Sequence, residues 1–452
     1  MSDISRRHFV KLLGASGATS LLSLTGCASQ PTQSTSTTAA TTPAATPSPA
    51  PAVVPRAAPK VVIIGGGFGG ATCAKYLRVY DSSIEVTLIE PNATYTTCPG
   101  SNWVIGGMRK MEDLAQNYNA LRSKHGVNVV QDRVTSINAD KRTVTLSGGR
   151  VLPYDKLVVS PGIDFRWNAI EGYDEAASQL IPHAWKAGAQ TTLLIKQLQA
   201  MPDGGKFIMS TPPMPFRCPP GPPERVSMVA HYLKTNKPRS KILVLDSKEN
   251  FSKQDLFVDA WNQLYPGMIE YVPLSRDGKV VRLDPKTRTL YTEQGTAHKG
   301  DVINIVPAQR AGDIAIASGL AKDGWCPVDH QTFESTMVPN VHVIGDSSSA
   351  GPIPKSGHMA NNIGKMAAAS IASAFRGGKR PPSSLVNTCY SLVAPDYGIS
   401  IAAVYRLDEK GQIAGVKGAG GVSPKDAASV FRVQEARFAQ GWWSSIVDDT
   451  FA

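Results

Sequence analysis

The feature that most constrains this fold is a glycine-rich turn between a predicted strand and a predicted helix. Residues 60–64 form a short β-branched apolar run, and residues 71–79 form the helix that follows the turn. The turn has the spacing Gly-x-Gly-x-x-Gly, with its glycines at Gly65, Gly67 and Gly70. Such glycines let the backbone approach a pyrophosphate at the helix N-terminus. A second predicted strand, residues 84–90, ends in Glu90, where an acid accepts from ribose hydroxyls. This predicts a Rossmann-like dinucleotide-binding unit.

Two later segments indicate which dinucleotide binds. Residues 341–346 form a strand that ends in Gly-Asp, and this run resembles the second flavin motif of two-dinucleotide flavoproteins. In that motif the acid, here Asp346, meets the ribityl chain; the alternative for Asp346 is an ordinary helix cap. Residues 157–162, which end in Gly162, resemble the crossover segment of the same proteins. The three motifs occur in the same order and predict FAD.

A second nucleotide domain is expected to begin near residue 205, but its glycine pattern is missing. Residues 205–210 read as its first strand, and residues 211–222 are a proline-rich loop that contains Cys218. Because proline lacks a backbone N–H, this loop removes donors that a pyrophosphate needs. Residues 241–246 keep the strand pattern. We therefore predict a degenerate NAD-like domain that does not use NAD(P)H.

Composition limits the remaining classes of function. A chain of 452 residues is too long for a single simple hydrophobic core, and its formal net charge is +11. That charge is compatible with an acidic partner, an anionic substrate, a membrane surface or an ordinary solvated surface. No basic patch with interleaved aromatics predicts nucleic-acid binding. The 8 His residues have no metal-ligand spacing, so no metal is expected. No Cys-x-x-Cys-His occurs, so this chain is not expected to attach haem c itself.

The first 57 residues read as export and tethering sequence. Residues 5–11 resemble a twin-arginine signal, and the apolar run 12–24 is too short to span a membrane. Residues 24–27 resemble a lipobox, which would make Cys27 a lipidated first residue; a chance Cys beside an ordinary cleavage site is the alternative. Residues 28–57 have the composition of a disordered tether. These patterns predict a periplasmic protein exported by the twin-arginine route, with membrane contact through lipidated Cys27.

The remaining cysteines differ in setting. Disulfide reductases of this class carry Cys-x-x-x-x-Cys after the first unit, but here Cys98 stands alone and Trp103 occupies the partner's place. Cys218 and Cys326 each stand alone in a Pro- or Gly-flanked loop. Cys73 and Cys389 read as buried packing thiols.

From residue 58 to 452 the chain resembles the flavin-binding subunit of flavocytochrome c sulfide dehydrogenase. The runs that carry the resemblance are residues 89–92, 95–98, 182–188, 218–222, 251–254, 324–329 and 354–357. The resemblance implies an α/β fold with two Rossmann-like, glutathione-reductase-like domains and a C-terminal α+β domain. The implied parts are an FAD domain of residues 58–170 and 298–380, an NAD-like domain of 171–297 and a C-terminal domain of 381–452.

The resemblance also implies site roles. Cys98 would carry FAD through an 8α-thioether, and Cys218 and Cys326 would form the redox disulfide. Glu224 would act as acid or base near the disulfide; a first-turn carboxylate favoured by the helix dipole is the alternative. Lys355 would contact the cofactor.

The expected reaction is oxidation of hydrogen sulfide, with electrons passed to a haem on a separate c-type cytochrome subunit. One alternative is a sulfide:quinone oxidoreductase, although the tail 442–449 is short and mixed rather than apolar. A non-catalytic FAD redox sensor or assembly factor is the alternative from another class.

Overall fold

The structure is a computed structural model that describes residues 57–379, 382 and 384–452. The predicted export signal, the lipobox-like run with Cys27 and nearly all of the predicted tether lie outside these residues. Residues 57–452 form one compact unit, which is described below.

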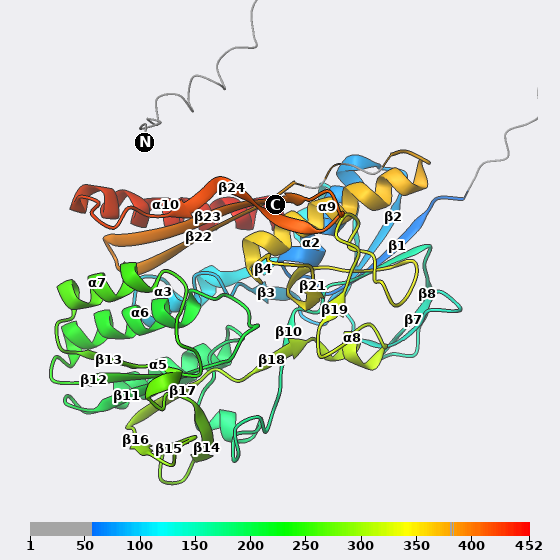
Figure 1. Ribbon diagram of the computed structural model, residues 1–452. Helices are drawn as coiled ribbons and strands as arrows, with labels where there is room; N and C mark the ends of the chain where they lie inside the picture. Colours follow the sequence, from blue (N-terminus) through cyan, green and yellow to red (C-terminus); the bar gives the residue numbers. More distant parts are fainter. Residues whose placement is uncertain (1–56, 380–381, 383) are drawn as a thin grey trace, which may run out of the picture. The chain divides into compact units, whose positions relative to one another are not determined.

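A five-stranded parallel sheet forms the first Rossmann-like half of the molecule. Its order is β20-β9-β1-β2-β5. The strands are β1 (Lys60–Ile64), β2 (Glu85–Ile89), β5 (Asn128–Val130), β9 (Lys156–Val159) and β20 (Val341–Val343). Helix α2 (Phe68–Tyr80) packs against α9 (Gly357–Phe375) beside this sheet (Figure 1). Because β20 comes late in the chain, this half is assembled from two distant segments.

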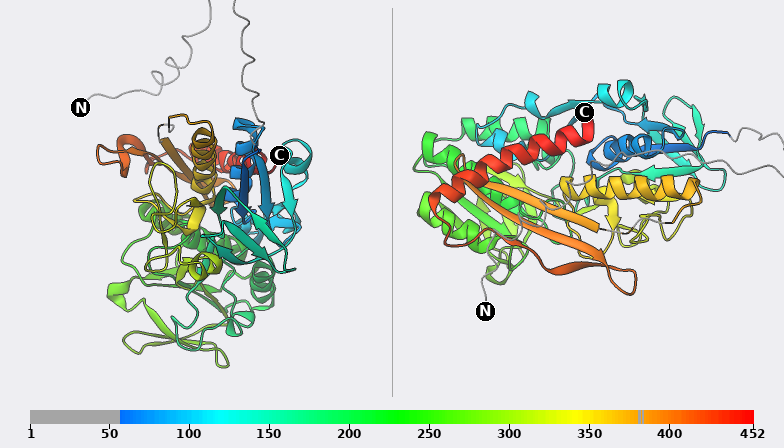
Figure 2. Two further views of the ribbon diagram at one scale, coloured as in Figure 1. Left: turned by 90° about the vertical axis from the view of Figure 1, so that its right-hand side faces the viewer. Right: turned by 90° about the horizontal axis from the view of Figure 1, so that it is seen from above.

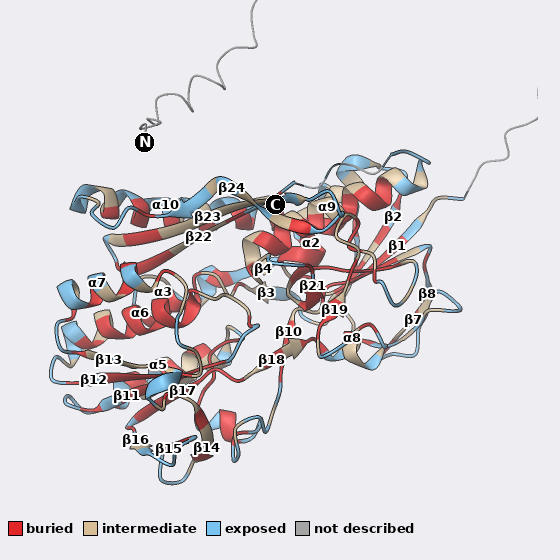
Figure 3. Ribbon diagram, in the orientation of Figure 1, coloured by how far each residue is buried: buried red, intermediate tan, exposed pale blue. Residues whose placement is uncertain are grey.

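A four-stranded parallel sheet forms the second half, in the order β13-β12-β11-β17. Its strands are β11 (Lys206–Thr211), β12 (Lys241–Asp246), β13 (Ile269–Val272) and β17 (Val302–Ile305). Its helices are α5 (Ala189–Ala200), α6 (Gly221–Asn236) and α7 (Gln254–Leu264). The unit β11–loop–α6 repeats the plan of β1–loop–α2. Buried residues follow the strands and the inner faces of these helices (Figure 3).

The C-terminal part is an antiparallel three-stranded sheet with one long helix. The strands are β22 (Ser384–Ala394), β23 (Tyr397–Leu407) and β24 (Ile413–Val422), followed by α10 (Ser429–Phe451). Helix α10 lies against β22 and β23 (Figure 2), and α6 and α7 contact β22 from the other side. The predicted fold class, two Rossmann-like domains and a C-terminal α+β domain, is confirmed; the exact domain boundaries stay predictions.

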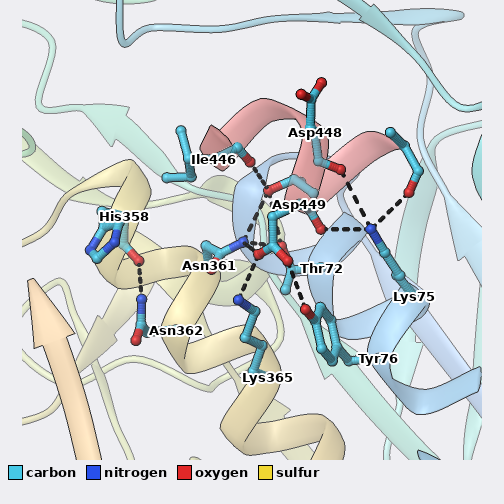
Figure 4. Close-up of polar contacts among 12 residues, drawn as sticks. Thr72, Lys75, Tyr76, His358, Asn361, Asn362, Lys365, Ile446, Asp448 and Asp449 are labelled. Carbon is cyan, nitrogen blue, oxygen red and sulfur yellow. Dashed lines mark hydrogen bonds and ion pairs between the residues drawn. The ribbon is translucent and has the colours of Figure 1, made fainter. Parts of the chain in front are cut away.

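The end of α10 is held to α2 and α9 by a polar cluster (Figure 4). The Asp449 carboxylate accepts hydrogen bonds from Tyr76 Oη at 2.7 Å and Asn361 Nδ2 at 2.8 Å, and pairs with Lys365 Nζ at 2.6 Å. Lys75 Nζ donates to the carbonyl of Ala452 at 2.7 Å. The C-terminal helix is therefore fastened to the first Rossmann-like half.

Shorter elements fill the connections. The helices are α3 (Ser101–Ile105), α4 (Asn119–Ser123) and α8 (Asp313–Ala317), with 3-10 turns at Glu112–Leu114, Ala177–Gln179, Leu274–Arg276 and Gly345–Ser347. The short strands are β3 (Thr94–Thr96), β4 (Ala115–Asn117), β6 (Val134–Asn138), β7 (Thr143–Leu146), β8 (Val151–Pro153), β10 (Ile163–Phe165), β14 (Val280–Asp284), β15 (Thr289–Thr292), β16 (Ala297–Lys299), β18 (Gln309–Ala311), β19 (Cys326–Pro327) and β21 (Ser348–Ser349).

Candidate functional site

A cavity of about 870 Å³ lies at the carboxyl ends of β1, β9 and β20. Ligands of open parallel sheets bind at this edge of the sheet. The predicted site residues that line the cavity are Gly65, Gly67, Glu90, Cys98, Gly162 and Asp346. Residues that follow the early strand β1 and the late strand β20 thus line the same cavity.

The glycine turn has the geometry that a phosphate site requires. Gly65 has φ +96°, and a Cβ there would collide with the carbonyl of Ser160. Gly70 does not line the cavity; a Cβ at this position would collide with the Gly65 carbonyl, so Gly70 permits close packing of α2 on β1. Helix α2 begins after Gly67 without a side-chain cap. Its N-terminus therefore faces the cavity with backbone groups that suit an anion.

Glu90 and Asp346 stand on different sides of this cavity. The Glu90 carboxylate accepts from Gly66 N at 2.9 Å and from Asn92 N at 3.0 Å, so it also fixes the glycine turn. Asp346 Oδ1 is buried and has no hydrogen-bond partner among the described residues. Burial raises the pKa of Asp346, although the charges of Arg217 and Lys355 act in the opposite direction. An unsatisfied buried acceptor fits a ligand that carries hydroxyl donors, as a ribityl chain does.

Lys355 lies behind Asp346 and does not line the cavity. Its Nζ donates to the carbonyls of Asp346 and Ser348, each at 2.8 Å, and lies 3.8 Å from the centroid of the Trp325 ring. Burial lowers the pKa of Lys355 to about 8. Lys355 therefore supports the Asp346 loop, and its expected contact with the cofactor stays a prediction.

Lys355 also joins the two cysteine segments. Cys218 N donates to the Lys355 carbonyl at 2.7 Å. Cys326 pairs with Ser348 across β19 and β21, and Ser348 is bound by the Lys355 ammonium. Burial raises the pKa of the Cys326 thiol to about 12, whereas Lys355 lowers it. One residue thus organises both thiol-bearing segments beside the cavity.

The five described cysteines are all free thiols in this structure. Cys98 lines the cavity, and its Sγ lies 3.7 Å from the Trp185 carbonyl. Cys218 has φ +60°, an uncommon conformation for a non-glycine residue, and burial raises the pKa of its thiol. The predicted disulfide between Cys218 and Cys326 stays a prediction. Cys73 and Cys389 are buried, as expected for packing thiols.

Glu224 is buried where α3, α6 and β22 meet. Its carboxylate accepts from Asn102 Nδ2 at 2.9 Å, from Trp103 Nε1 at 3.0 Å and from Leu392 N at 3.0 Å. Burial raises its pKa in spite of these donors. Helix α6 begins at Gly221, and its first turn contains Glu224 together with prolines, which are tolerated in a first helical turn. Glu224 is thus a buried carboxylate in the first turn of α6, as the alternative from the sequence expected, and its role as acid or base stays a prediction.

Sequence reasoning missed two basic residues at this site. Arg217 lines the cavity, and its guanidinium donates to the Trp185 carbonyl. Arg225 is fully buried and donates to Asn102 Oδ1 at 3.0 Å and to the His183 carbonyl at 3.1 Å. Arg217 lies within the Cys218 loop and Arg225 lies in the helix that follows it. Their proximity to Cys218 in the sequence was the signal that could have identified them.

Among the described residues there is no cluster of His, Cys, Asp or Glu that could hold a metal. None of the described helices is both long and apolar enough to cross a membrane.

The fold and the cavity define a two-dinucleotide flavoprotein of the disulfide-oxidoreductase class. Residues 59–191 match the pyridine nucleotide-disulphide oxidoreductase family. Residues 191–307 match the central part of the sulfide dehydrogenase [flavocytochrome c] flavoprotein chain, and residues 381–451 match the flavocytochrome c sulphide dehydrogenase flavin-binding family. The chain belongs to the flavocytochrome c sulfide dehydrogenase flavoprotein family. The flavin-binding match supports FAD, which the glycine turn and Asp346 fit.

Individual relatives agree with this assignment. The chain is 62% identical over 45 residues to the sulfide dehydrogenase [flavocytochrome c] flavoprotein chain of Chlorobaculum thiosulfatiphilum, which is 10% of this chain and 94% of that protein. It is 24% identical over 306 residues to the mitochondrial sulfide:quinone oxidoreductase of Mus musculus, which is 64% of this chain and 65% of that protein. The chain thus covers less than two thirds of that relative.

Solved structures share the fold. The sulfide:quinone oxidoreductase of Aquifex aeolicus superposes with a TM-score of 0.66 at 18% identity, over 87% of this chain and 92% of that chain. Putidaredoxin reductase, in its covalent complex with putidaredoxin, gives a TM-score of 0.62 at 16% identity, over 87% and 94% of the two chains.

Proposed function

We propose that this chain is an FAD-dependent sulfide dehydrogenase that passes electrons to a c-type cytochrome subunit. The observation that carries the proposal is the replacement of a second glycine turn by the Cys218 loop. That loop is bonded through Lys355 to the same segment that positions Asp346 and Cys326. A thiol therefore stands where a nicotinamide would otherwise approach the flavin.

In the proposed reaction hydrosulfide attacks a disulfide between Cys218 and Cys326. The S–S bond breaks, one cysteine retains the added sulfur as a persulfide, and the other leaves as a thiolate. FAD, when bound in the cavity, would supply the two-electron acceptor for these thiols. The Lys355 ammonium favours an anion at Cys326, and Glu224 accepts or returns the accompanying proton. Release of the sulfur product and transfer of electrons to the cytochrome complete the cycle.

The relationship to sulfide:quinone oxidoreductases makes a quinone acceptor the second candidate. A quinone acceptor would require the C-terminal tail to enter a membrane. The tail instead packs on the protein: Trp443 is 7% exposed, and its Nε1 donates to the Pro99 carbonyl at 2.9 Å. This packing supports the cytochrome as acceptor. A redox sensor without catalytic turnover remains the alternative from another class.

Stopped-flow absorbance of the purified holoprotein tests the proposal. Sulfide should bleach the flavin, and turnover should be faster with cytochrome c than with a short-chain quinone. Cys218→Ser and Cys326→Ser should each retain FAD and bleach normally with dithionite, yet lose sulfide-driven bleaching by about 10³-fold or more. Near-full turnover in either variant would show that sulfide attacks the flavin without the disulfide. Bleaching without turnover would favour a sensor.

We also propose periplasmic export by the twin-arginine route and a lipid anchor at Cys27. The residues that support this, 5–27, lie outside the described part of the chain. The mature protein should begin at Cys27 and fractionate with membranes, and Cys27→Ala should release it or block its processing. A mature N-terminus within residues 28–57 would refute the anchor.

A further inference from the structure

A buried lysine, Lys253, lies in residues 251–254, a run to which the proposed reaction assigns no role. Lys253 is 8% exposed and immediately precedes α7, with φ +60°. Its Nζ donates to Ser391 Oγ at 2.8 Å and to the Ile399 carbonyl at 3.4 Å. In the described part of the chain it forms no ion pair. A buried cation and a left-handed non-glycine backbone are both costly, so their coincidence indicates a constraint beyond packing.

Strand β22 brings this ammonium near Glu224 without a direct ion pair between them. Lys253 binds the side chain of Ser391, and the Glu224 carboxylate accepts from the backbone N–H of the next residue, Leu392. The two opposite charges are thus held by consecutive residues of one strand, one charge from the start of α7 and the other from the first turn of α6. Burial raises the pKa of Glu224, and the hydrogen bonds from Leu392, Asn102 and Trp103 lower it, as does the charge of Lys253 to a smaller extent. Burial lowers the pKa of Lys253 to about 8, and Cys389 and then Glu224 act in the opposite direction.

The other charged or titratable groups around this pair are few. Lys253 faces Cys389 on β22, Cys218 before α6 and Glu435 on α10, in addition to Glu224. Glu224 faces Lys253, and it also acts on Cys218, Cys389 and its buried neighbour Arg225. Glu435 already has a partner cation, since Arg432 Nη1 lies 3.4 Å from its Oε2, and Ser400 and Ser423 also donate to it at 2.6 and 2.7 Å. Glu224 is therefore the carboxylate whose charge Lys253 can balance.

We propose that Lys253 is a positioning residue that holds Glu224 as a carboxylate, so that Glu224 can accept a proton at Cys218. This inference rests on the proposed function, in which Cys218 belongs to the redox disulfide. Burial raises the pKa of Glu224 in spite of three hydrogen bonds to its carboxylate, so loss of a nearby cation would make the group take up a proton more readily. Protonated Glu224 could not accept the proton that hydrogen sulfide or a thiol loses, and the Lys253 ammonium prevents that state.

Infrared spectroscopy of the holoprotein measures the protonation of Glu224 without any sulfide. A band of a protonated carboxylic acid that disappears in Glu224→Gln is assigned to this residue. We expect no such band in the wild type at about pH 7, which is above the ordinary pKa of a Glu carboxyl group and below the pKa of about 8 of Lys253. In Lys253→Met the band should appear, and its titration midpoint should rise by about one pH unit or more. Lys253→Arg, which retains the charge, should behave as wild type.

The same variants separate positioning from a structural role. The acidic limb of sulfide-driven flavin bleaching should move to higher pH in Lys253→Met, by the same amount as the infrared midpoint, and Lys253→Arg should restore it. If Lys253→Met does not fold, Ser391→Ala, which removes the hydrogen bond that holds Nζ, must move the infrared midpoint in the same direction.

A Glu224 band in the wild type, or an unchanged midpoint in the folded variant that is measured, would overturn the inference. Failure of wild-type protein to react with sulfide would instead refute the proposed function, because the infrared midpoint is independent of sulfide.

Discussion

At the scale of single residues, Cys98 has the most direct prediction. It lines the FAD cavity, and no second cysteine stands at the position of the usual partner. We expect a thioether, so acid-precipitated protein should stay yellow and a tryptic peptide with Cys98 should carry the flavin mass. Cys98→Ala should release its flavin in acid, and Cys73→Ala, a buried thiol on α2, should not. Complete release of flavin from acid-treated wild type would exclude the covalent bond.

The same scale shows why some site residues were predictable and others were not. Gly65, Gly67 and Glu90 follow from local spacing because one strand, turn and helix place them together. Lys253 and its contact Ser391 are far apart in the chain, and the spacing of residues contains no signal for that contact. The supporting role of Lys355 could not be predicted either, because it depends on contacts with backbone carbonyls whose positions a sequence pattern does not specify.

At the scale of elements, the polar cluster at the end of α10 predicts a pH-dependent attachment. Burial would raise the pKa of Asp449, but hydrogen bonds from Lys365, Tyr76 and Asn361 outweigh it and the pKa lies below its ordinary value. The stabilisation is therefore present above about pH 4, the pKa of an unfolded-state Asp, and is lost as pH falls through the folded-state pKa. Asp449→Asn should abolish this acid-sensitive part.

Calorimetry at neutral pH measures the size of that contribution. Because Asp449 and Lys365 are both about one third exposed, we expect Asp449→Asn to cost about 1–2 kcal/mol. Because the entropy of unfolding grows with chain length, the unfolding midpoint of this large unit should fall by about 1–3 °C. The exposed Asp140→Asn, in the turn between β6 and β7, serves as the control and should melt as wild type. Equal melting of both variants would show that the cluster does not fasten α10.

Element boundaries were predictable to within a few residues, and the deviations have local causes. Helix α2 begins at Phe68 rather than residue 71, because the last glycine of the turn already adopts helical geometry. Strand β20 ends at Val343, before the Gly-Asp pair, which forms a 3-10 turn. Alternation and apolar runs report the core of an element well, whereas its ends depend on which backbone groups find partners.

At the scale of the whole molecule, the two Rossmann-like halves share a plan but differ in the groups that they offer to a dinucleotide. In the second half the acid at the end of β12, Asp246, corresponds to Glu90. Its carboxylate is buried and already accepts from Thr211 Oγ1 and Lys248 Nζ, each at 2.5 Å. Helix α6 has Pro in its first turn, and Cys218 N is bonded to Lys355. These contacts occupy the groups that, in the first half, are predicted to bind the ribose and the pyrophosphate.

NADH and NADPH should therefore fail to reduce the flavin. At about 1 mM, the upper end of ordinary Michaelis constants, neither nucleotide should bleach the holoprotein on the timescale at which sulfide does so. Dithionite should bleach it fully, which shows that the flavin is competent. Asp246→Asn should leave this resistance unchanged, because the blocked helix N-terminus remains. Rapid bleaching by micromolar NADH would mean that the Cys218 loop still admits a nicotinamide, and the sulfide reaction would lose its structural basis.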